Sequence, residues 1–147
     1  MLPPFHATLP KPNTGTPLWS PLASICWQLV SFMLLVAVTV LALMPQVPRE
    51  LSLGWDKLNH TSAFCALAIA WRFAFPGKAW RWVQLWLGLM VLGVAIEVAQ
   101  HFVPGRQADA ADLLADALGA STGMVMAAAL EWLLRRRKSP PSRSSAG

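Results

Sequence analysis

Three groups of ionisable and hydrogen-bonding side chains interrupt the apolar stretches of this 147-residue sequence at helical spacings. Members of each group are mostly three or four positions apart, so each group lies along one face of a helical segment. Carboxylates, imidazoles and an amide in such an arrangement could exchange protons, coordinate a cation or hold the polar part of a ligand. The groups are Asp56, Lys57 and His60; Glu97, Gln100 and His101; and Asp109, Asp112 and Asp116.

The segments that carry these groups are too apolar for a water-soluble domain. Hydrophobic residues make up 55% of the chain and charged residues 13%, whereas soluble domains carry about 25% charged residues. A bilayer core requires about 20 residues of apolar helix. The predicted fold class is therefore all-α, a membrane bundle of four transmembrane helices that span residues 22–44, 57–75, 82–103 and 110–134.

Composition divides the chain into three parts. Residues 1–21 are rich in proline and predict a flexible leader, and residues 22–134 form the four-helix transmembrane domain. Residues 135–147 predict a basic, disordered cytoplasmic tail. The two cysteines, Cys26 and Cys65, lie within apolar runs and are expected to be small apolar fillers.

The distribution of basic residues predicts the orientation, because cytoplasmic flanks of transmembrane helices collect Lys and Arg. One side holds Arg49, Lys57 and Arg106. The other side, which is expected to be cytoplasmic together with both chain termini, holds Lys11, Arg72, Lys78, Arg81, Arg135, Arg136, Arg137, Lys138 and Arg143. The run from Arg135 to Lys138 then anchors the topology on anionic lipid, and no nucleic-acid partner is predicted.

With this orientation, all three polar groups lie toward the outer side of the membrane. A carboxylate that faced hydrocarbon would cost about 2.5–3.5 kcal/mol, so the groups should converge inside the bundle. Gly119 and Gly123 continue the acidic face of the last span and favour close helix approach there. The predicted result is a hydrated pocket that opens outward, with the binding residues Asp56, Lys57, His60, Glu97, Gln100, Arg106, Asp109, Asp112 and Asp116.

Spacing alone leaves several roles open for this cluster. The side chains could form a hydrogen-bonded clasp between helices, a ligand or catalytic pocket, or scattered interfacial anchors. Glu97, Asp112 and His60 are the catalytic candidates, as a general base with an assisting imidazole. His60, Glu97, His101 and Asp112 have side chains suited to a divalent ion, but no HExxH motif is present, so no metal is predicted and any cofactor stays unknown.

The same residues, taken in order, resemble the VanZ-like family. The resemblance covers about residues 50–127 and rests on five short motifs in the family's order and spacing. They are Asp56-Lys57 with His60, Glu97 with Gln100, Pro104-Gly105-Arg106, Asp109 with Asp112, and Asp116 with Gly119 and Gly123.

Two positions depart from the pattern of that family. An aromatic residue often follows the histidine, where this chain has Thr61, and asparagine usually occupies the position of Asp116. If the family's asparagine amide donates a hydrogen bond, Asp116 could replace it only in the protonated form.

The resemblance implies a small membrane protein with an envelope-related role. The family is named for an accessory protein that lowers susceptibility to the glycopeptide teicoplanin, and most of its members have no assigned activity. We therefore expect a multi-pass protein of the bacterial plasma membrane that binds or modifies an envelope lipid or cell-wall-related molecule. The alternatives are a lipid hydrolase or transferase, and a structural helper subunit with a membrane-protein partner.

Overall fold

The computed structural model is a bundle of helices, and it describes residues 20–45, 56–106 and 109–138. Within these residues it contains no strands. The helices are α1 (Pro21–Leu43), α2 (Asp56–Ala74), α3 (Ala79–Gln100) and α4 (Ala110–Lys138). The all-α prediction is thus confirmed, while most of the predicted leader and the tail beyond residue 138 lie outside the described residues.

Proline and a capping residue set both ends of α1 and the end of α2. The Ser20 side chain caps α1 by accepting a hydrogen bond from the Ala23 amide at 3.3 Å, and Pro21 occupies the first turn, where no amide donor is needed. α1 and α2 end just before Pro45 and Pro76. α4 continues to Lys138, four residues beyond the predicted end, because Arg and Lys favour helix and complement its C-terminal dipole.

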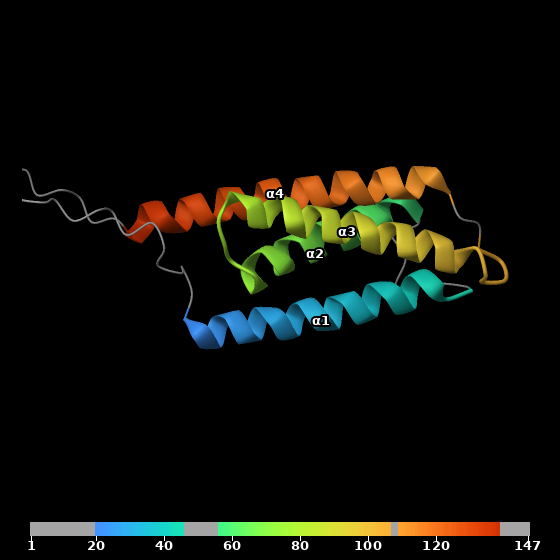
Figure 1. The fold of residues 1–147 in the computed structure, drawn as a ribbon, viewed down its shortest axis with the longest axis horizontal. Helices are drawn as coiled ribbons and strands as arrows, with labels where there is room; N and C mark the ends of the chain where they lie inside the picture. The colour runs from blue at the N-terminus through green and yellow to red at the C-terminus, as the bar shows by residue number, and fades with distance from the viewer. Residues whose placement is uncertain (1–19, 46–55, 107–108, 139–147) are drawn as a thin grey trace, which may run out of the picture.

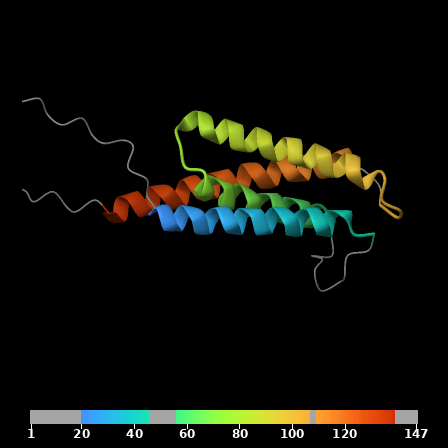
Figure 2. The same cartoon turned by 60° about the horizontal axis from the view of Figure 1, so that its bottom comes forward.

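α2 is the central helix of the bundle. It packs most extensively against α4 and also contacts α1 and α3, whereas α1 packs on α2 and α3 (Figure 1). The start of α1 and the end of α4 lie at the same end of the molecule in both views (Figure 2). The apolar core between the helices contains Phe64, Leu67, Ala68, Leu85, Leu89, Ile96, Ala120 and Met124.

Two glycines allow the close approach of α4 to α2. A Cβ atom at Gly119 would overlap the Thr61 carbonyl, and one at Gly123 would overlap the Cys65 carbonyl. Any side chain at these positions would therefore force the two helix backbones apart. The face of α4 that carries Gly119 and Gly123 therefore packs against α2 of the same chain, in agreement with the inward orientation predicted for the last span.

Three of the described helices, α1, α3 and α4, are long and apolar enough to cross a membrane. α2 is not among them, because its first half contains charged, imidazole, amide and hydroxyl side chains. Large apolar side chains are exposed on the outside of the other helices, including Phe32, Val91 and Val125, which are 62%, 70% and 69% exposed. Apolar surface of this extent is typical of contact with lipid.

Candidate functional site

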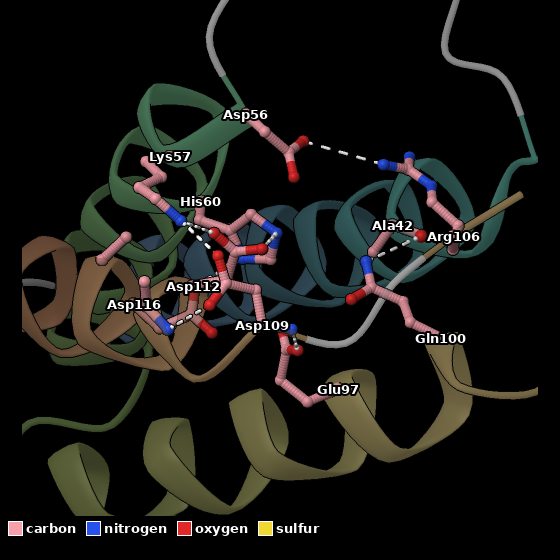
Figure 3. Close-up of polar contacts among 12 residues, drawn as sticks. Ala42, Asp56, Lys57, His60, Glu97, Gln100, Arg106, Asp109, Asp112 and Asp116 are labelled. Carbon is pink, nitrogen blue, oxygen red and sulfur yellow. Dashed lines mark hydrogen bonds and ion pairs between the residues drawn. The ribbon is translucent and has the colours of Figure 1, made fainter.

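The predicted polar residues other than His101 come together at the end of the bundle opposite the start of α1 and the end of α4 (Figure 3). They are contributed by the beginning of α2, the end of α3, the α3–α4 loop and the beginning of α4. Two of the acids, Asp112 and Asp116, are 3% and 0% exposed. The convergence expected from helical spacing is therefore observed for the side chains that α2 and α4 contribute.

Lys57 links α2 to α4 through two carboxylates. Its ammonium group lies 2.8 Å from Asp109 Oδ2 and 2.9 Å from Asp112 Oδ1. The hydrogen bond from Lys57 holds the pKa of the Asp109 carboxyl, which precedes α4, below its ordinary value. Lys57 thus neutralises part of the acidic face of α4. It contacts only Oδ1 of Asp112, so the Oδ2 atom makes no contact with Lys57.

His60 lies between the two buried aspartates of α4. Its Nδ1 atom is 2.9 Å from Asp116 Oδ1, and its Nε2 atom is 3.9 Å from Asp112 Oδ2, which is beyond hydrogen-bonding distance. The hydrogen bond with Asp116 fixes the orientation of the ring, and an ionised Asp116 carboxylate, which can only accept, places the proton on Nδ1. The departure from asparagine at this position thus places an acid directly against the histidine.

Gln100 and Arg106 join the cluster to α1, a helix for which the sequence predicted no part in the site. Gln100 Nε2 donates to the Ala42 carbonyl at 3.0 Å. Arg106 donates from Nε to the Met44 carbonyl at 2.9 Å and from Nη2 to the Leu41 carbonyl at 3.3 Å. The last carbonyls of a helix lack intrahelical partners, and the stop at Pro45 is the sequence signal that could have indicated these acceptors.

Gly105 helps to orient Arg106 toward this end of the bundle. Its φ of +82° lies in the left-handed region, which is accessible to glycine at little cost. Arg106 Nη1 also approaches Asp56 Oδ1 at 3.7 Å, a distance that gives an ion pair without a hydrogen bond. Figure 3 shows the side chains of Asp56 and Arg106 facing one another.

Glu97 supports the start of α4. Its Oε2 atom accepts a hydrogen bond from the Asp109 amide at 2.9 Å, while Asp109 Oδ1 accepts one from the Ala111 amide at 2.9 Å. Both contacts satisfy amides near the helix N-terminus. Glu97 Oε1 is buried and has no hydrogen-bond partner within the described residues. Glu97 is thus engaged with backbone and does not line the cavity described next.

A cavity of about 410 Å³ lies between α1, α2 and α3 beside the polar cluster. Its wall is mostly apolar, and its polar end includes His60 and Arg106. A second, mainly polar cleft shares Asp56, Gln100 and Arg106 with it and adds Lys57, Asp109 and Asp112. The remaining lining residues of the cavity are Val38, Leu41, Ala42, Asn59, Ser62, Ala63, Phe64 and Ile96.

The structure places His101 outside the cluster. It is exposed at the C-terminus of α3, and its ring contacts that of Phe102 edge-on at 5.6 Å between centroids. His101 thus does not share the buried face of α3 on which Gln100 lies, and its side chain is poorly placed to be a cation ligand together with His60, Glu97 and Asp112.

A buried ion pair at the opposite end of the bundle was missed. Arg72 Nη2 lies 2.8 Å from Glu131 Oε1, and the guanidinium group lies 4.5 Å from the ring centre of Trp82. Arg72 and Glu131 are 5% and 9% exposed. Arg72 resembled a flanking anchor in the sequence, and the available signal was Glu131, a single acid one turn before a basic run.

The helices and the enclosed polar cluster together define a helical membrane protein. Within that class, a family model described as VanZ/LLP1 matches residues 9–133, and the chain belongs to this family. The comparison with curated proteins and that with solved structures each gave no significant match.

Proposed function

We propose that this VanZ-like protein crosses the bacterial plasma membrane four times, with both termini in the cytoplasm. The support is the separation of charge along the bundle. Arg135–Arg137, Lys78 in the α2–α3 turn and Arg81 in the first turn of α3 lie at one end, whereas the acidic cluster lies at the other. The positive-inside tendency then directs the cavity and the polar cleft toward the outer face.

α2 is the fourth span in this proposal, despite its polar first half. Its polar residues His60 and Arg72 are buried against α4 rather than exposed on the outside. Intramembrane ionisable residues are tolerated where they face the bundle interior and pair with one another. A central helix can therefore cross the membrane with a composition that would be costly for a peripheral one.

The protein, in this account, is an accessory protein that binds an envelope amphiphile. The observation that carries the proposal is that an apolar cavity lies beside a polar cleft, with Asp56, Gln100 and Arg106 lining both. Small-molecule sites commonly combine an apolar enclosure with a few oriented polar groups. The cavity would hold an apolar chain, and the cleft would hold its polar head.

The charges of the cleft suggest the chemistry of the head group. Arg106 and Lys57 offer cationic donors to a phosphate or carboxylate, and Asp56 at the rim could accept hydrogen bonds from hydroxyl or amine groups. An envelope lipid or a lipid-linked cell-wall precursor combines these features. A role in glycopeptide resistance would be an analogy with the protein for which the family is named.

Lipid titration of Arg106 variants tests this function. Purified protein without divalent cations is titrated with an anionic phospholipid, and Arg106→Ala is expected to weaken binding by about tenfold, the loss of one charged hydrogen bond. Arg81→Ala, an exposed arginine near the opposite end, is the matched control and should bind as wild type. Equal binding by Arg106→Ala and wild type would contradict the proposed head-group contact.

A lipid hydrolase or transferase is the second candidate, and the pairing of His60 with Asp116 favours it. A carboxylate on Nδ1 leaves Nε2 available as a proton acceptor at the cavity, the arrangement used by general bases. A screen of envelope lipids should then show turnover that His60→Gln abolishes and His101→Gln preserves. Absence of turnover across the screen would exclude this candidate and leave the binding function.

A further inference from the structure

The imidazole of His60 has one ring nitrogen engaged and one free. Nδ1 is held by Asp116, whereas Nε2 makes no hydrogen bond to any described residue. The residue is only 8% exposed and lines the cavity. Nε2 therefore offers a lone pair that a ligand in the cavity can reach.

Two carboxylates lie near this nitrogen. One ligand atom each from Asp56, His60 and Asp112 lie within 4.8 Å of one another. Oxygen and nitrogen ligands on one ion with bonds of about 2.1 Å are separated by roughly 3–3.5 Å. Side-chain rotations that shorten these separations by up to roughly 1.5 Å would therefore bring all three onto a single ion.

The contacts around these ligands leave the required atoms free. Lys57 binds Asp112 Oδ1, so that Oδ2 faces His60. Arg106 lies 3.7 Å from Asp56 and donates its hydrogen bonds to carbonyls of α1 instead. An ion can thus bind Asp56 and Asp112 without breaking a hydrogen bond that the described residues make.

The charge balance of the cluster also favours a cation. Within the described residues, the cluster contains only Lys57 and Arg106 as permanent positive side chains. These face the carboxyl groups of Asp56, Glu97, Asp109, Asp112 and Asp116. Excess carboxylate charge beside a cavity in an apolar bundle requires either protons or a bound cation.

We propose that Asp56, His60 and Asp112 bind one divalent transition-metal cation at the polar end of the cavity. This differs from the sequence-based expectation of no metal. Asp116 is a positioning residue, because metal-bound histidines typically donate their other N–H to a carboxylate. Three protein ligands of this type suit Zn²⁺ and leave one position open toward the cavity, whereas an imidazole disfavours Ca²⁺ and Mg²⁺.

Calorimetric titration with Zn²⁺ alone, on full-length protein free of any histidine tag and without added lipid, tests the site. Wild type is expected to bind one ion. His60→Gln is expected to weaken binding by at least about tenfold, and His101→Gln, which changes an exposed histidine outside the cluster, should bind as wild type. No binding by wild type, or equal binding by wild type and His60→Gln, would overturn the proposal.

A second variant and a spectroscopic measurement guard against misfolding of the His60 variant. Asp56→Asn changes a residue at the rim whose ion pair with Arg106 is long, so it should retain the wild-type melting temperature and lose affinity for Zn²⁺. Co²⁺ bound to the wild type should show visible d–d absorption that Asp56→Asn reduces. Unchanged absorption would count against the site, while the lipid proposal, tested without divalent cations, would still stand.

Discussion

At the scale of single residues, the cluster combines contacts that stabilise the bundle with atoms that have no partner. Lys57 connects α2 to Asp112 of α4, and His60 connects it to Asp116. Asp116 Oδ2 and Glu97 Oε1 are buried without a hydrogen-bond partner in the described part of the chain. A cluster that served only as a clasp would be expected to satisfy its buried acceptors, so the unsatisfied ones favour a site that is retained for function.

The ion pair of Lys57 with Asp109 predicts that the stability of the protein decreases at acidic pH. Because the folded-state pKa of Asp109 is depressed, its contribution is complete above the unfolded pKa of about 3.9 and decreases as pH falls through the folded value. Wild type should therefore lose melting temperature below about pH 4 more steeply than Asp109→Asn. Unfolding in detergent, measured over pH 3–6, checks this, and parallel curves for the two proteins would contradict it.

At the scale of elements, the contact between α2 and α4 determines how accurately the polar side chains are positioned. Gly123→Ala would place a Cβ atom against the Cys65 carbonyl and is expected to destabilise the protein by about 1–3 kcal/mol. Denaturant unfolding provides the measurement. Gly88→Ala is the matched control, since its Cβ would meet only the Trp71 side chain at 3.3 Å.

The control should be close to neutral, because the preference for alanine over glycine within a helix offsets the small shift that the Trp71 ring must make. If Gly123→Ala were as stable as Gly88→Ala, the close approach of α4 to α2 would not be a determinant of the fold.

Most helix boundaries could be predicted from the sequence because proline provides strong local signals. Pro45 and Pro76 end the first two helices close to the expected positions. α3 (Ala79–Gln100) begins and ends three residues before the predicted span 82–103. α4 ends four residues after its predicted end, because Arg and Lys also favour helix. The central position of α2 was not predictable, since it depends on which helix faces bury one another.

The site was predictable where one helical face carries several ionisable side chains. This holds for Asp112 and Asp116, whose spacing alone indicated a shared inward face. The contribution of α1 could not be predicted, because Leu41, Ala42 and Met44 take part through backbone carbonyl oxygens. Every residue has such an oxygen, so the residue types give no signal. Pairing of Arg72 with Glu131 was likewise missed, because it depends on the packing of two distant helices.

At the scale of the whole molecule, the proposed orientation predicts different accessibility at the two ends. In a variant without native cysteines, Lys78→Cys in the α2–α3 turn should be protected from a membrane-impermeant maleimide in intact cells. Phe102→Cys, which replaces an exposed residue after α3, should be labelled. Labelling after cell lysis controls for reactivity, and the reverse pattern would contradict cytoplasmic termini.

The central claim is that the cavity between α1, α2 and α3 holds an amphiphile, and filling that cavity tests it most directly. Ala63→Phe places a ring in the cavity and leaves the ionisable groups unchanged, whereas Ala95→Phe makes the same substitution at an exposed position of α3. Mass spectrometry of the purified proteins measures the envelope amphiphile that each retains. Wild type and Ala95→Phe are predicted to retain it and Ala63→Phe to lose it with little change in melting temperature; equal retention by all three would contradict the claim.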